Sequence, residues 1–241
     1  RPLPRLGFGP RLIYCVGGRV GDVGRSSTQS LGTVDLYDPL NASWKQLASM
    51  ASPRSAHCCI ALDGKLYAVG GYGVASQLAT AEVYDPRTEG WQPLAKMTTQ
   101  RTALGLAAVG GKVYAIGGYD GDRVLESVEA YDPQLGSWAL VASMSVQRSH
   151  TASVVLDGKI YTMGGLGASQ SRLKTVEVYD PQADSWQRVA SMPRPLISHA
   201  ATAIGGKIYV TGGEGQRSLN SVCVYDPQAN TWTQLASMST A

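Results

Sequence analysis

The chain has 241 residues, of which 44% are hydrophobic and 16% are charged, and it contains 28 glycines. This composition is typical of a folded chain rich in tight turns and argues against a disordered tail. The net charge of +3 comes from 21 basic and 18 acidic residues without runs of either sign, so neither nucleic acid nor a membrane surface is indicated as a partner. No segment has the roughly 20 apolar residues of a membrane span or the pattern of a signal peptide. We therefore expect a soluble, cytoplasmic protein.

The same short elements recur along the chain. Double glycines begin at Gly17, Gly70, Gly117, Gly164 and Gly212, in steps of 53, 47, 47 and 48 residues. The five tryptophans each stand seven residues after the tyrosine of a Tyr-Asp-Pro triplet, at Trp44, Trp91, Trp138, Trp186 and Trp232. Five copies of one unit therefore fill the chain. We place their approximate bounds at 1–50, 51–97, 98–144, 145–192 and 193–238, within a single domain that spans 1–241.

Within the second unit, the pattern predicts four strands. Residues 58–62, 65–69 and 81–84 are short runs rich in β-formers, and a fourth strand runs through Trp91. Asp63-Gly64 joins the first two runs and favours a type I′ hairpin, in which both central residues need a positive φ. A four-stranded sheet repeated every 40–50 residues or so is typical of a β-propeller, whose sheets bury their faces against their neighbours. The fold class expected is thus all-β, a propeller of four-stranded antiparallel blades.

Several residues are expected to build the packing between blades. The tryptophans are predicted to be buried there, and Gly118 is predicted to matter for stability because its backbone needs a positive φ or a close neighbour. Cys15 is predicted to be a small core residue and Cys223 to be exposed. Cys58 and Cys59 would point to opposite faces of one strand, so we expect no disulfide framework.

The repeated motifs resemble those of the kelch repeat over essentially the whole chain. They are an Arg-Ser strand start, Gly-Lys-Leu-Tyr-Ala-Val-Gly-Gly, Glu-Val-Tyr-Asp-Pro and Trp-x-x-Leu-Ala-x-Met. Gly-Gly-Tyr-Asp-Gly at 117–121 and Ser-Val-Glu-Ala-Tyr-Asp-Pro at 127–133 are most similar to the kelch domains of BTB-kelch proteins, the substrate adaptors of cullin-RING ubiquitin ligases. The resemblance implies a non-catalytic domain that binds a target protein, with the ligase recruited through regions outside this chain. An actin-binding or cytoskeletal scaffold is the alternative, because its repeats would look the same.

The resemblance also implies a question about how the ring closes. The family usually has six blades, with a strand from the far end of the chain completing the first blade, whereas five repeats are present here. We expect either a five-bladed ring closed by an irregular N-terminal segment, or a six-bladed ring that lacks one blade and the closing strand. The innermost strand of the first blade is not evident in 1–11.

The resemblance places the partner-binding face where the loop after each double glycine meets the start of an innermost strand. Tyrosine and arginine, which are frequent in binding hot spots, occur among these positions, and the arginines favour an acidic peptide. Leu166 and Ile197 share the same register. The predicted partner-binding residues are Arg19, Ser55, Tyr72, Gln77, Thr102, Tyr119, Arg123, Ser149, Arg172, Glu214 and Arg217.

Other repeated residues are predicted to be structural. Arg54, Arg101 and Arg148 each follow a methionine by four residues and are expected to join blades through backbone carbonyls, whereas the fifth unit has Leu196 there. The aspartates of the Tyr-Asp-Pro triplets are expected to fix turns by accepting hydrogen bonds from nearby N–H groups. They are Asp38, Asp85, Asp132, Asp180 and Asp226.

No constellation of residues predicts an enzyme or a cofactor site. His57, His150 and His199 lie on separate blades without the close spacing of metal ligands. No Lys-Ser/Thr pair follows the glycine-rich loops, so they do not match a phosphate-binding loop. A redox role for a cysteine is not indicated, because no cationic cluster adjoins one to lower its pKa.

Overall fold

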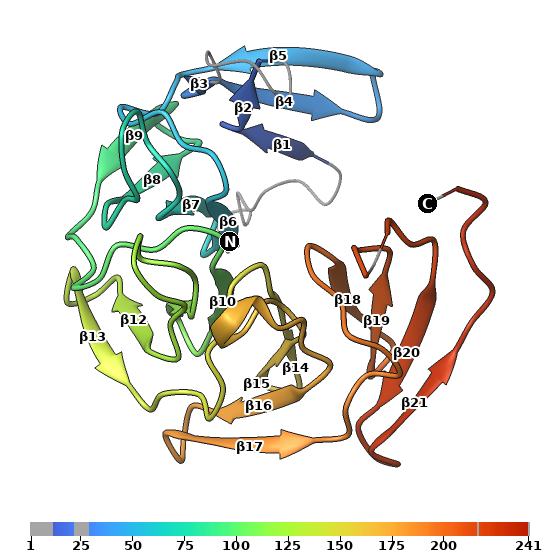
Figure 1. Cartoon of the computed structure of the whole chain (residues 1–241). Coiled ribbons are helices and arrows are strands. Elements are labelled where there is room, and N and C mark those ends of the chain that lie inside the picture. The colour runs from blue at the N-terminus through green and yellow to red at the C-terminus, as the bar shows by residue number, and fades with distance from the viewer. Residues whose placement is uncertain (1–11, 22–28, 216, 241) are drawn as a thin grey trace, which may run out of the picture.

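The computed structural model describes residues 12–21, 29–215 and 217–240, and it confirms an all-β, five-bladed propeller. Figure 1 shows the blades following one another in chain order around a common centre, with one 3-10 turn, η1 (Ala168–Gln170), in front of the fourth blade. The chain therefore folds as five sheets of consecutive segments, as its periodicity predicts.

Four of the blades are four-stranded antiparallel sheets whose strands pair in sequence order from the centre outwards. The second blade contains β6 (Cys58–Leu62), β7 (Lys65–Val69), β8 (Ala81–Asp85) and β9 (Gly90–Pro93). The third contains β10 (Gly105–Val109), β11 (Lys112–Ile116), β12 (Val128–Asp132) and β13 (Ser137–Val141). The fourth contains β14 (Ala152–Leu156), β15 (Lys159–Met163), β16 (Val176–Asp180) and β17 (Ser185–Val189). The fifth contains β18 (Ala200–Ile204), β19 (Lys207–Thr211), β20 (Val222–Asp226) and β21 (Thr231–Gln234).

Turn chemistry sets the register within each blade. Leu62 pairs with Lys65, and the intervening Asp63 and Gly64 have φ values of 49° and 75°. This confirms the predicted type I′ hairpin, whose twist matches that of the flanking strands. At the other turn of the blade, the N–H of Arg87 donates to the Asp85 carboxylate over 2.9 Å. The corresponding bond recurs in the other four blades, so the aspartates of the Tyr-Asp-Pro triplets fix turns as expected.

The first blade differs from the others. Its described strands are β1 (Ile13–Val16), β4 (Val34–Asp38) and β5 (Ser43–Leu47), with a short hairpin of β2 (Arg19–Val20) and β3 (Gln29–Ser30) at one end. By its pairing with β4, β1 corresponds to the second strand of the other blades. The innermost strand that we sought in 1–11 lies outside the described residues.

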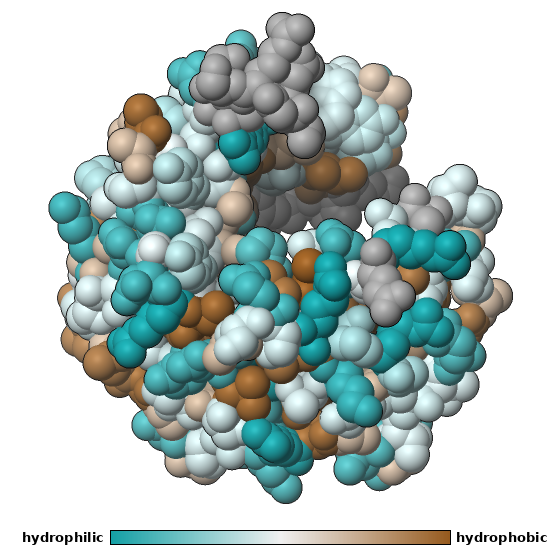
Figure 2. Space-filling model, in the orientation of Figure 1, coloured by the Kyte–Doolittle hydropathy of each residue, from teal (hydrophilic) through white to brown (hydrophobic). Residues whose placement is uncertain are grey.

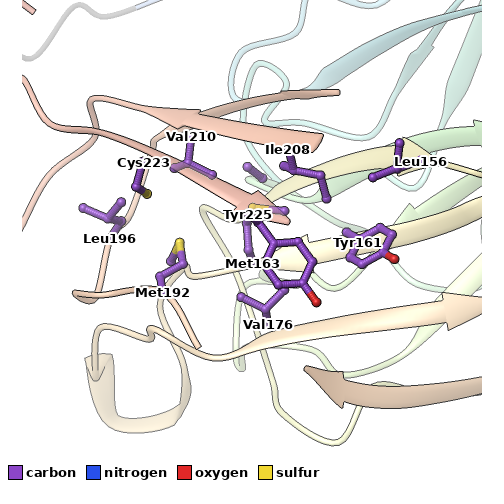
Figure 3. Close-up of a cluster of buried hydrophobic side chains, with 11 residues drawn as sticks. Leu156, Tyr161, Met163, Val176, Met192, Leu196, Ile208, Val210, Cys223 and Tyr225 are labelled. Atoms are coloured by element: carbon purple, nitrogen blue, oxygen red, sulfur yellow. The ribbon is translucent and has the colours of Figure 1, made fainter. Parts of the chain in front are cut away.

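The buried side chains lie between adjacent blades. Figure 3 shows the cluster between the fourth and fifth blades, in which Tyr161 and Met163 of one blade face Ile208, Val210 and Tyr225 of the next. Similar clusters fill the junctions between the second, third and fourth blades. Each blade thus buries both faces of its sheet only when it has a neighbour on each side.

Two predictions about cysteine are wrong, and for the same reason. Cys223 is buried among Met163, Leu196 and Val210, because its side of β20 faces the fourth blade. Cys15 is exposed because its side of β1 faces no blade in the described part of the chain. In Figure 1, no labelled strand lies between the first blade and the fifth. The position of a blade in the row therefore decided the burial, which strand alternation alone does not show. All four cysteines are free thiols.

The tryptophans join each blade to the one before it. The indole N–H of Trp138 donates over 2.9 Å to the carbonyl of Ala95 in the preceding blade. Trp91, Trp186 and Trp232 form the same bond with Ala48, Ala142 and Ala190. These four rings are half-buried, and each packs on the tyrosine of its own Tyr-Asp-Pro triplet. Trp44 also contacts Tyr37 but is 60% exposed. The prediction that the five tryptophans are buried is therefore met only in part by the four half-buried rings, and it is wrong for the first blade.

The repeated arginines have the predicted structural role. Arg101 is completely buried and donates hydrogen bonds of 2.8 Å to the carbonyls of Gly117 and Ser127. Arg54 and Arg148 are also buried and make equivalent bonds. Each also forms an ion pair with a buried glutamate: Arg54 with Glu82, Arg101 with Glu129 and Arg148 with Glu177.

Candidate functional site

A repeated backbone framework holds the loops at one end of the propeller. The residue after the double glycine pairs with the start of an innermost strand, so that Tyr72 and Ser55 exchange hydrogen bonds of 2.7 and 3.0 Å. Thr102 pairs with Tyr119 in the same way. The pattern continues with Ser149 and Leu166, and with Ile197 and Glu214. We call the end formed by these loops the loop face.

The double glycines are required for this framework. The N–H of Gly118 donates to the carbonyl of Arg148 over 2.7 Å, which links the third blade to the segment that leads into the fourth. Gly118 has a φ of +101°, and a Cβ atom there would lie 2.9 Å from the Thr102 carbonyl oxygen. No L-residue fits this position without strain. The sequence predicted a positive φ or a close neighbour at Gly118, and the structure has both.

A chain of backbone hydrogen bonds connects the innermost strands where they begin. Ala103 donates to Ala56, His150 to Ala103 and Ser198 to His150, over 2.8, 2.7 and 3.0 Å. All four residues have φ values between 48° and 52°. Four successive blades therefore share one backbone conformation at this end, which makes the loop face a preorganised surface.

The framework brings the predicted binding residues together in small groups, one group on each blade. Tyr72 pairs with both Ser55 and Gln77, and Leu166 pairs with both Ser149 and Arg172. Ser55, Thr102 and Ser149 are buried, so they shape the floor of the face. Side chains at the loop tips remain accessible, and these belong to Arg19, Tyr72, Arg123, Arg172, Glu214 and Arg217.

A hollow of about 520 Å³ lies between the first and second blades on this face. The predicted residues Arg19, Ser55 and Tyr72 line it, together with Ser30 and Val74. The Ser30 hydroxyl lies 2.9 Å from the Ser55 hydroxyl and donates to the Tyr72 carbonyl, also over 2.9 Å. Val74 is 84% exposed and provides an apolar wall. The hollow thus combines hydroxyl, guanidinium and apolar groups, a mixture that suits a peptide better than a purely apolar ligand.

Sequence reasoning missed five residues of this hollow, namely Gln29, Ser30, Ala56, Gly73 and Val74. Ser30 faces Arg19 across the β2–β3 pair, as Gln77 faces Tyr72 in the second blade. The sequence did not indicate that Ser30 pairs with Arg19, because the segment between Gly18 and Ser30 is longer than the corresponding loop between Gly71 and Gln77. Without the pairing, no alignment of the units places Ser30 opposite Arg19.

The predicted arginines do not form a single cluster. Arg172 donates to the Glu214 carboxylate over 3.0 Å and thereby bridges the fourth and fifth blades. Arg123 lies 3.7 Å from Asp120 within its own loop. Partial burial raises the pKa of Asp120. The backbone N–H groups of Arg123 and Asp122 donate hydrogen bonds to its carboxylate and outweigh that effect, so the pKa of Asp120 lies below its usual range. Two of the loop-face arginines are therefore already engaged with carboxylates.

The histidines do not meet. His57 and His199 occupy equivalent positions in the second and fifth blades, while His150 is exposed one position earlier in the fourth. Burial lowers the pKa of both His57 and His199 to about 4, so these imidazoles are neutral near pH 7. Among the described residues, no group of three His, Cys, Asp or Glu side chains could hold a metal ion. Burial also raises the thiol pKa of Cys58 and Cys223 to about 11, which disfavours the reactive thiolate.

Comparison with known proteins identifies the repeats. The Kelch motif matches residues 5–51, 53–98 and 100–145, which together make up more than half of the chain. The chain belongs to the kelch-repeat family. Residues 142–241 also match the KLHDC2/KLHL20/DRC7 Kelch-repeats domain.

Individual relatives of this kelch chain match it over shorter lengths. Kelch-like ECH-associated proteins 1B and 1A of Danio rerio are each 40% identical to it over 60 residues, which is 25% of this chain and 10% of each relative. The chain thus matches only about a tenth of the length of these curated relatives. A solved structure titled "Structure of YjhT" superposes with a TM-score of 0.80 at 14% identity, over 94% of this chain and 82% of that one. At that identity the likeness shows the fold alone. In the described residues, no helix has the length and apolarity to cross a membrane.

Proposed function

We propose that this kelch propeller is a non-catalytic recognition domain that holds a segment of a target protein on its loop face. The observation that carries the proposal is the hollow between the first two blades, where Arg19, Ser30, Ser55 and Tyr72 offer hydrogen-bonding groups beside the exposed Val74. The repeated framework fixes the backbone of the loops before a partner arrives. Binding then costs less ordering entropy than it would on mobile loops.

The partner class follows from the kelch family and from the partial relatives. Kelch propellers bind protein partners, and the 60-residue likeness to kelch-like ECH-associated proteins supports a cullin-RING adaptor, in which this domain would select the substrate. The ligase would be recruited through regions outside this chain. The arginines of the loop face suit an acidic target segment, and we propose a cytoplasmic site of action.

A site-specific photocrosslinking experiment tests the binding face. A photoreactive phenylalanine analogue replaces Tyr72 in one protein and Leu135 in a control, and each is illuminated in cell lysate before mass spectrometry. Leu135 is 75% exposed in the turn between β12 and β13, at the opposite end of the strands from the loop face. We expect defined adducts from position 72 and only background from position 135. Equal labelling from both positions would refute the loop face as the binding surface.

The identity of the captured proteins distinguishes the ligase-adaptor proposal from the actin-binding scaffold alternative. Recovery of one protein whose turnover depends on a cullin-RING ligase would support substrate selection. If the adduct at position 72 is actin, and the domain also sediments with filamentous actin, the scaffold alternative replaces the ligase proposal.

A further inference from the structure

One kind of surface hollow recurs at three junctions of the propeller. Each lies between the segment that follows the methionine of one repeat and the loop that follows the double glycine of the next blade. Between the second and third blades it contains Thr99 and Asp120, and between the third and fourth it contains Val146 and Ala168. Between the fourth and fifth it contains Arg194 and is about 350 Å³ in volume. The three hollows can therefore be compared position by position.

The charge of these hollows differs sharply. The hollow between the second and third blades contains Asp120 and Asp122, and the hollow between the third and fourth contains Glu126. Among the described residues, no Lys or Arg lines either of them. At the junction of the fourth and fifth blades, Arg194 and Arg217 flank the opening, and none of the described residues that line it is acidic. Figure 2 shows hydrophilic side chains gathered over the rim of the fifth blade.

Nothing in the described part of the chain neutralises these two arginines. Both are exposed, and neither forms an ion pair with a described residue. The neighbouring Glu214 is held instead by Arg172, at 3.0 Å from its guanidinium. Pro195 and Leu219 supply apolar surface beside the two cations.

We infer that this junction, which we call the Arg194–Arg217 hollow, binds an acidic side chain of a protein segment that crosses the loop face. Paired guanidinium groups bind a carboxylate or a phosphoryl group through charge-assisted hydrogen bonds. Pro195 and Leu219 would contact an apolar residue adjacent to the acid. A feature present at one junction and reversed in charge at the others suits a site used once per molecule. This inference rests on the proposed function, and it assigns the acidic part of the target to the outer rim of the fifth blade.

Fluorescence anisotropy with a fluorescein-labelled octaglutamate peptide tests the inference. The test variant is R194Q/R217Q. The control K45Q/R87Q removes the same charge near the β4–β5 and β8–β9 turns, at the opposite end of the strands. We expect the wild type to bind octaglutamate, the test variant to bind about tenfold more weakly, and the control to change by less than about twofold. Added salt should weaken the wild-type interaction. Circular dichroism and thermal melting should show all three proteins equally folded.

Three outcomes would overturn the inference. Equal losses in the test and control variants would show that octaglutamate responds only to net charge, and no binding to the wild type would remove the site. Tighter binding of a single-stranded 12-nucleotide DNA than of octaglutamate, dependent on both arginines, would make the hollow a nucleic-acid site. If the photocrosslink from position 72 persists in any of these cases, the proposed recognition function stands while the acidic-residue site fails.

An octapeptide with a single central phosphoserine and no other acidic residue tests whether the hollow prefers a phosphoryl group or a carboxylate. Tighter binding of this peptide than of its glutamate counterpart, lost in R194Q/R217Q, would identify a phosphorylated residue as the ligand. The reverse order would identify a carboxylate. Each of these results supports an acidic side chain in the Arg194–Arg217 hollow.

Discussion

The guanidinium of Arg101 and the carboxylate of Glu129 lie 3.0 Å apart, and both side chains are completely buried. The carboxylate also accepts hydrogen bonds from the backbone N–H groups of Thr98 and Thr99, over 2.7 and 3.2 Å. In the fifth blade, three of these four groups change together. Leu196 replaces the arginine, Cys223 replaces the glutamate, and Pro193, which has no N–H, replaces Thr98. The charged arrangement is thus kept complete or exchanged as a whole, which avoids an unpaired buried charge.

We expect R101L to reduce the free energy of unfolding by about 3–5 kcal/mol, because Glu129 would be buried without its cation. The triple variant T98P/R101L/E129C copies the arrangement of the fifth blade and should recover most of that loss. Urea denaturation of the wild type and both variants measures the difference. A triple variant no more stable than R101L would show that the fifth blade relies on other contacts to tolerate its apolar pair.

We expect G118A to destabilise the protein by about 3 kcal/mol or more, because its φ is +101° and its Cβ atom would contact the Thr102 carbonyl. G110A is the matched control. Gly110 has a φ of +59° in an exposed hairpin turn, and a Cβ atom there would have no atom within 4 Å. Its cost should be about 1 kcal/mol. Chemical denaturation compares the two variants, and equal losses would contradict the role assigned to close packing.

We expect W138F to lower the free energy of unfolding more than W44F does, by about 1 kcal/mol or more. Phenylalanine keeps much of the ring contact but loses the hydrogen bond from Trp138 to Ala95. Trp44 donates no such bond to a described residue and is 60% exposed. Thermal unfolding monitored by circular dichroism gives the comparison. If W44F is the more destabilising of the two, Trp44 makes a contact with residues outside the described part of the chain.

We expect acid to destabilise the fold through His57 and His199, whose pKa values burial lowers to about 4. The nearby Arg54 adds to the shift at His57. In the unfolded chain both imidazoles have a pKa near 6.5. Between pH 6.5 and 4 the unfolded state binds protons that the folded state excludes, so stability falls as the pH is lowered through this range. The expected loss is roughly 2–3 kcal/mol per histidine by pH 4.

Urea denaturation at a series of pH values measures this effect, with H57L/H199L as the comparison. Leucine is chosen because Leu104 occupies the equivalent position in the third blade. The variant should show a flatter dependence of stability on pH between 6.5 and 4. An unchanged slope would contradict the assignment of this pH dependence to the two histidines.

The sequence by itself determined the features that depend on local chemistry and on repetition. Asp63-Gly64 specified a hairpin turn because few other residue pairs adopt its backbone angles. The regular spacing of Gly-Gly, Tyr-Asp-Pro and Trp specified the blades, because each repeated position needs the same backbone conformation or the same neighbour. The interblade role of Arg54, Arg101 and Arg148 could be predicted for this reason, and so could the group of positions that forms the loop face.

Only the tertiary structure decided the features that depend on a particular neighbour. Cys223 is buried because its side of β20 faces the fourth blade, and Cys15 is exposed because its side of β1 faces no described blade. Strand alternation does not reveal which side of a strand meets a neighbouring blade. Ser30 reaches Ser55 and Tyr72 through a pairing that the longer loop of the first unit conceals. Arg194 and Arg217 line one hollow although 23 positions separate them. Local sequence sets the conformation of each unit, but the contacts across a junction depend on how two complete blades pack.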